Sequence, residues 1–109
     1  MSVKPGYTGI WRITGMSMWD QDFIDMIAPG CLEIKTYGTG RISFGTVEAD
    51  IVCNIEKYGD QEKLLFTFTG WDEGDEVTGN GWAVIEGDRM EGWFCFHLGD
   101  ESTFEAERT

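Results

Sequence analysis

The stretch TVEADIVCNI at residues 46–55 decides the fold. Apolar side chains at every second position alternate with mainly polar ones over ten residues: Val47, Ala49, Ile51, Cys53 and Ile55 against Thr46, Glu48, Asp50, Val52 and Asn54. Successive side chains of a β-strand point to opposite faces. The period of two therefore predicts a long strand with one buried face and one solvent-facing face.

Shorter segments on both sides of this strand repeat its alternation. We expect strands near residues 7–15, 32–36, 41–44, 64–68, 79–86, 90–98 and 102–108. Glycines are interpreted as the turns between them, at Gly30, Gly38, Gly40, Gly45, Gly59, Gly70, Gly74, Gly79, Gly81, Gly87 and Gly99. In the segment 90–98, one face is expected to carry Met90, Phe94, Phe96 and Leu98, and the other Trp93, Cys95 and His97.

These segments predict an all-β chain that forms one domain over residues 1–109. A small antiparallel meander of about eight strands, closed or partly open as a barrel, would leave few exposed strand edges. A two-sheet sandwich is the alternative. One short helix is expected at residues 20–28, where Asp20 can cap the N-terminus and Phe23, Ile24 and Ile27 share one side.

The chain is strongly acidic. Twenty Asp and Glu residues against eight Lys and Arg residues give a net charge of -12, and residues 70–109 hold eleven of those acids with two bases. This charge argues against direct binding to nucleic acid or to an anionic membrane. It is compatible with a solvated surface, with a basic protein partner or with a bound cation.

The cysteines and the N-terminus indicate the compartment. Cys31, Cys53 and Cys95 are an odd number without C-x-x-C spacing, which suits neither a disulfide framework nor a zinc site. The N-terminus lacks the apolar stretch of a secretory signal, and no run is long enough to span a membrane. We therefore expect a cytoplasmic protein, monomeric or homodimeric.

Two resemblances can be stated from short motifs. The opening GIWR at residues 9–12 resembles the G-x-W start of lipocalins and related calycin barrels, which implies a barrel whose tryptophan closes one end. The series GIWRI, WDQDFID, APG, GTGRISFG, TGNGWAVIEGD and GDESTFEAER is similar to small bacterial all-β proteins. That second resemblance implies a compact β domain and supplies no activity, cofactor or catalytic residue.

No residue set predicts catalysis, and no cofactor is expected. His97 is the single histidine, and it shares a strand face with Glu91, Trp93 and Cys95. Residues two apart on a strand face stand about 7 Å apart, too far for a direct Cys–His hydrogen bond without side-chain reach. A small hydrolase is therefore the last hypothesis. The acidic loop WDEGDE at residues 71–76 lacks calcium-loop spacing, and no metal site is assigned.

Two sets of residues are candidates for binding. An acidic, partly aromatic surface for a basic protein would use Trp19, Asp20, Asp22, Phe23, Asp72, Glu73, Asp75 and Glu76. For the residues at 19–23, a plug that closes one barrel mouth is the preferred interpretation, because it explains the apolar side chains without a partner. An aromatic interior drawn from Trp11, Phe66, Phe68, Trp82, Phe94 and Phe96 could instead hold a small apolar ligand. A non-enzymatic interaction domain is the first hypothesis, and a ligand-binding barrel is the second.

Overall fold

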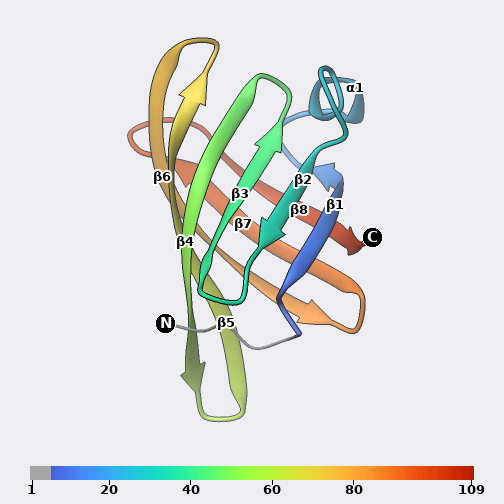
Figure 1. Ribbon diagram of the computed structural model, residues 1–109, viewed down its shortest axis with the longest axis vertical. Helices are drawn as coiled ribbons and strands as arrows, with labels where there is room; N and C mark the ends of the chain where they lie inside the picture. Colours follow the sequence, from blue (N-terminus) through green and yellow to red (C-terminus); the bar gives the residue numbers. More distant parts are fainter. Residues whose placement is uncertain (1–5) are drawn as a thin grey trace.

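Eight antiparallel strands follow one another in sequence order around a closed barrel (Figure 1). The computed structural model describes residues 6–109. The elements are β1 (Gly9–Met16), α1 (Gln21–Ile24), β2 (Cys31–Ile34), β3 (Thr39–Phe44), β4 (Val47–Tyr58), β5 (Gln61–Asp72), β6 (Asp75–Glu86), β7 (Arg89–Phe96) and β8 (Glu101–Arg108). The predicted all-β meander is confirmed in its closed form, and the sandwich alternative is wrong.

The barrel closes where the last strand pairs with the first. Arg12 lies opposite Glu107 and Ile13 opposite Ala106, with a register shift between Ile13 and Gly15. Closure gives every strand two neighbours, so the barrel has no edge strand.

The long strand predicted from residues 46–55 is β4, and its alternation is confirmed. Val47, Ala49, Ile51 and Cys53 are at most 3% exposed, whereas the residues between them face solvent. The alternation continues across the barrel because directly paired residues point the same way. Ile51, for example, lies opposite Phe68 of β5 and Gly40 of β3.

Several glycines expected in turns lie inside strands, so their assignment to turns was wrong. Gly40, Gly70, Gly79 and Gly81 occupy inward-facing strand positions, as does Gly92, which was not assigned to a turn. Phe68 lies opposite Gly79, Phe66 opposite Gly81, and Phe104 opposite Gly92. Each ring reaches the space that a side chain at the paired glycine would fill. The hairpin turns use other glycines with positive φ, at Gly38, Gly45, Gly59, Gly74 and Gly87.

The helix is shorter than expected. Asp20 caps it as predicted and accepts a hydrogen bond from the Phe23 backbone N–H at 3.0 Å, but α1 ends at Ile24. Asp25 then turns to bind Arg12 and the backbone N–H of Gly30, which draws the chain back toward the barrel. Ile27 consequently lies outside the helix and is 74% exposed, so its assignment to the buried side was wrong.

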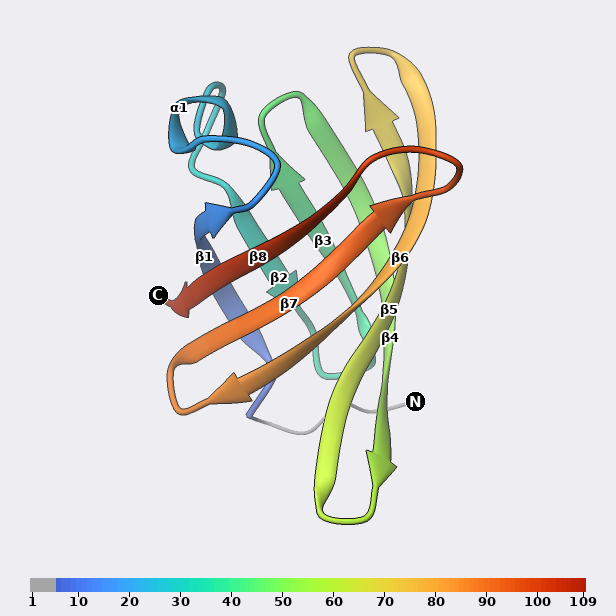
Figure 2. The same ribbon diagram turned by 180° about the vertical axis from the view of Figure 1, so that it is seen from behind.

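The meander sorts the loops between the two ends of the barrel. The loops that follow β1, β3, β5 and β7 meet at the end that carries α1, here called the α1 end (Figures 1 and 2). The turns that follow β2, β4 and β6 lie at the other end, here called the far end. Residues 17–30, 45–46, 73–74 and 97–100 are thereby brought to one end of the molecule.

We predict that Gly81→Ala destabilises the barrel by about 1–3 kcal/mol, the usual cost of overpacking a core. An added Cβ would lie 2.3 Å from the Trp93 carbonyl oxygen and 2.6 Å from Cζ of Phe66. The matched control is Gly15→Ala, whose Cβ would meet nothing closer than 3.6 Å and should change stability by less than about 0.5 kcal/mol. Urea unfolding measures both variants, and equal free energies of unfolding would contradict the packing of rings over inward glycines.

Candidate functional site

The barrel interior is filled by aromatic and aliphatic side chains. Of the six residues predicted to line it, Trp11, Phe66, Phe68 and Phe94 are at most 5% exposed, and Phe96 packs against them. The ring centroid of Phe94 lies 5.5 to 6.2 Å from those of Phe44, Phe68, Phe96 and Phe104. Such contacts place ring against ring through the middle of the barrel.

Trp82 was expected inside and lies outside. Its neighbours Gly81 and Ala83 face inward, where the ring of Phe66 and the Cβ of Phe94 occupy the space at Gly81. Trp82 thus shares the outer face with Leu65 and Trp93, which lie directly opposite it on β5 and β7. The Lys63 ammonium lies 4.4 Å from the centroid of the Trp82 ring.

Trp19 and Phe23 close the α1 end of the barrel. The Trp19 ring centroid lies 5.9 Å from Phe23, 5.4 Å from Phe44 and 6.2 Å from Phe94. This packing agrees with the plug interpretation of residues 19–23 and leaves both rings partly buried. Asp20 and Asp22 of the same segment are exposed to solvent.

One ion pair fastens this plug to the barrel wall. Both terminal guanidinium nitrogens of Arg12 donate to the Asp25 carboxylate, at 2.7 and 2.9 Å. The same carboxylate accepts from the Gly30 backbone N–H at 2.9 Å and from Nε2 of Gln21 at 2.9 Å. These donors, Arg12 first, hold the pKa of Asp25 well below its usual range. Asp25 therefore keeps its negative charge and its three partners down to acidic pH.

The acidic stretch at 71–76 is mostly strand, so its assignment as a loop was wrong. Asp72 ends β5, Asp75 and Glu76 begin β6, and the turn itself is Glu73 and Gly74. Thr46 donates to Oδ1 of Asp72 at 2.6 Å, which ties this hairpin to the neighbouring β3–β4 turn. Asp100 and Glu101 lie at the same end, after β7. We call Asp20, Asp22, Asp72, Glu73, Asp75, Glu76, Asp100 and Glu101 the acidic rim.

The α1 end also exposes large apolar side chains that sequence reasoning missed. Met18, Met26, Ile27 and Leu98 are all exposed there, Leu98 by 95%. Leu98 was expected on the buried face with Met90, but the chain turns after β7, where the Gly99 N–H donates to the Phe96 carbonyl. Leu98 sits in that turn with φ of 56°, a region that non-glycine residues rarely occupy.

Cys31, Cys53 and Cys95 are unpaired, and within residues 6–109 no hydrogen bond joins Cys95 to His97. Cys95 donates to Oδ1 of Asn80 at 3.3 Å, and His97 lies in the exposed loop beyond β7. Burial raises the pKa of the Cys53 thiol to about 11, which keeps it protonated at neutral pH. Among residues 6–109, no three His, Cys, Asp or Glu side chains converge in a way that could hold a metal ion.

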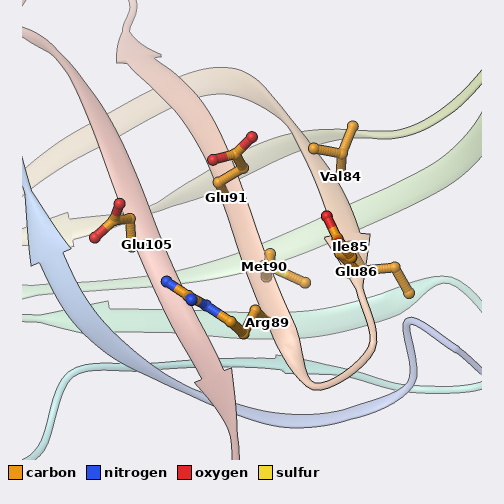
Figure 3. Close-up of a pocket in the computed structure, with 7 residues that line it drawn as sticks. All are labelled: Val84, Ile85, Glu86, Arg89, Met90, Glu91 and Glu105. Carbon is orange, nitrogen blue, oxygen red and sulfur yellow. The ribbon is translucent and has the colours of Figure 1, made fainter.

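A surface hollow of about 370 Å³ lies on the outer face of β6–β8 (Figure 3). Glu91 and Glu105 lie directly opposite each other on β7 and β8, and Arg89 lines the same hollow. Both carboxylates are solvent-exposed and belong to an open sheet face. This mixed-charge surface lies apart from the acidic rim, toward the far end.

No helix among residues 6–109 is long and apolar enough to cross a membrane. Comparison with family models, curated proteins and solved structures gives no match to the chain.

We predict that Asp25→Asn lowers the free energy of unfolding at pH about 7, because the plug loses its charged acceptor. Folding lowers the pKa of Asp25, so the ionised carboxylate contributes fully to the free energy of unfolding above the ordinary carboxyl pKa of about 4. That contribution is lost as the pH falls from there toward the lowered pKa of the folded state. The difference in free energy of unfolding between wild type and Asp25→Asn should therefore shrink as the pH falls from about 5 to about 2. Asp22→Asn, an exposed acid of the same helix, is the control. A gap that stays constant over this range would contradict the account.

Proposed function

We propose that the protein is a non-enzymatic interaction domain whose α1 end binds the basic surface of another protein. One observation carries the proposal: the acidic rim lies at the same end of the barrel as the exposed side chains of Met18, Met26, Ile27 and Leu98. Residues 17–30, 45–46, 72–76 and 97–101 contain no Lys or Arg. The chain therefore gathers negative charge and exposed apolar area at the same place.

The charge distribution supports a cationic partner. The bases of the described chain lie in the strands or toward the far end: Arg12, Lys35, Arg41, Lys57, Lys63, Arg89 and Arg108. A field of one sign at one end accelerates encounter with a surface of opposite sign and repels like-charged surfaces. A partner that normally binds nucleic acid has such a basic surface.

The exposed apolar side chains support protein rather than a simple counter-ion as the partner. Protein interfaces combine a desolvated apolar centre with a polar, solvent-accessible border. Methionine is adaptable and common at binding surfaces, and Met18 and Met26 flank α1 on either side. Contact with these side chains would add apolar burial to the electrostatic attraction.

The packed interior favours this proposal over a small-ligand barrel of lipocalin type. Trp11, Phe66, Phe68 and Phe94, which would line a ligand cavity, are already buried against other side chains. The three cysteines are unpaired, which supports the proposal of a reducing, cytoplasmic compartment.

The test uses a hexalysine peptide as the basic probe, with affinity measured by calorimetry at low and physiological ionic strength. The rim variant combines Glu73→Gln, Asp75→Asn and Asp100→Asn. The matched control combines Asp60→Asn, Glu86→Gln and Glu107→Gln, three exposed acids away from the rim with the same change in net charge. At roughly 0.5 kcal/mol per exposed charge pair, the rim variant should bind about tenfold more weakly.

The affinity of the control variant for hexalysine should stay within about twofold of the wild-type affinity. Added salt should weaken the binding of the peptide to all three proteins. Equal losses in both variants would show that net charge alone attracts the peptide and would contradict a specific binding end. Binding that does not weaken in high salt would contradict it as well.

A further inference from the structure

Trp71 lies on the outer face of β5, next to the acidic rim, and its side chain is 57% exposed. Its direct partners in the two neighbouring strands are both carboxylates, Glu48 of β4 and Glu76 of β6. Side chains directly opposite in a sheet have Cβ atoms about 5 Å apart, so one aromatic ring stands between two negative charges. The sequence alone could not reveal this arrangement, because Glu48 is distant from Trp71 in the chain.

Three of the other four tryptophans of the chain contact a cation or another aromatic ring. Arg108 lies over Trp11, with Cζ 4.3 Å from the ring centroid, and Lys63 lies over Trp82 at 4.4 Å. Trp19 packs in the aromatic plug. Within residues 6–109, no cation or aromatic ring contacts the ring of Trp71 in this way. Two of the chain's own indoles thus hold a cation, whereas Trp71 presents a ring and two carboxylates to solvent.

Trp71, Glu48 and Glu76 line a surface hollow of about 330 Å³, which leaves room for an incoming side chain. Gly70, which has no side chain, and Thr69 form part of its lining, together with Asp50. Arg41 is the cation in this hollow, and it lies 3.7 Å from Glu48 and 3.9 Å from Asp50 with all three side chains more than half exposed. Exposed pairs at such distances are worth little, so Arg41 neutralises the hollow weakly.

We propose that Trp71, Glu48 and Glu76 anchor one arginine side chain of the basic partner. The guanidinium would stack on the indole face while its edges donate hydrogen bonds to the two carboxylates. Glu76 also belongs to the acidic rim, so the anchor is continuous with the α1 end. This inference rests on the proposed function and names the chemical group that it recognises.

Arginine is favoured over lysine by the shape of the site. A planar guanidinium can offer its face to Trp71 and its edge to a carboxylate at the same time, whereas an ammonium is a compact and strongly hydrated point charge. The anchor therefore predicts selectivity between two peptides of equal charge, which the acidic rim alone does not.

The experiment compares hexa-arginine with hexalysine, using two-dimensional NMR of the ¹⁵N-labelled protein to measure affinity and the shift of the Trp71 indole N–H. The variant is Trp71→Leu and its control is Trp93→Leu, another outer-face tryptophan, whose direct partners are Trp82 and Thr103. Glu76→Gln is matched by Glu105→Gln, each removing one exposed negative charge. The remaining resonances show in the same spectra that each variant is folded.

Wild type should bind hexa-arginine several-fold more tightly than hexalysine, with a large shift of the Trp71 indole resonance. Trp71→Leu should weaken hexa-arginine about tenfold and remove the selectivity, and Glu76→Gln should weaken it about threefold. The affinities of Trp93→Leu and Glu105→Gln for hexa-arginine should both stay within about twofold of the wild-type affinity.

An unchanged affinity of Trp71→Leu for hexa-arginine would overturn the anchor. The proposed function would still stand in that case if the rim variant bound hexalysine more weakly than wild type. Equal losses in Trp71→Leu and Trp93→Leu would also overturn it. If wild type bound neither hexa-arginine nor hexalysine, the anchor and the proposed function would both be contradicted. Self-association of wild type that Trp71→Leu abolishes would identify a second copy of the chain as the occupant and overturn an arginine of another protein.

Discussion

The ladder between β1 and β8 is the constraint on which the rest of the arrangement depends. Because the strands pair in sequence order and the last pairs with the first, the meander closes and its loops alternate between two ends. The rim acids lie in the connections after β1, β5 and β7 or in the strand ends beside them, and closure places all three connections at the α1 end. Charges that are scattered along the sequence become one negative end because the barrel is closed.

Packing inside the barrel explains which side chains are left for the outside. Rings opposite inward glycines fill the interior, as with Phe66 and Gly81, and Trp19 and Phe23 close the α1 end. The ion pair of Arg12 with Asp25 fastens that closure. With the aromatic residues of the core and plug occupied in this way, Trp71 and the exposed apolar side chains around α1 are groups that this end of the barrel offers to a partner.

Much of the fold could be predicted from residue patterns, because a period of two and hairpin glycines are local signals. The alternation at residues 46–55 located β4, and Asp20 located the start of the helix. Register is not local: Gly79 and Gly81 resemble turn residues until Phe68 and Phe66 are placed opposite them. For the same reason Trp82 was assigned to the interior. The rim acids could be named from the sequence, but the pairing of Trp71 with Glu48 and Glu76 depends on register.

The central claim is that the α1 end is the binding surface, and NMR shift mapping of the labelled wild-type protein with hexalysine tests it most directly. The account predicts that the backbone amides that shift most belong to residues 17–30, 71–76 and 97–101, with the far-end turns nearly unchanged. Shifts that spread evenly over the barrel, or that concentrate at the hairpins of residues 58–61 and 86–89, would contradict it.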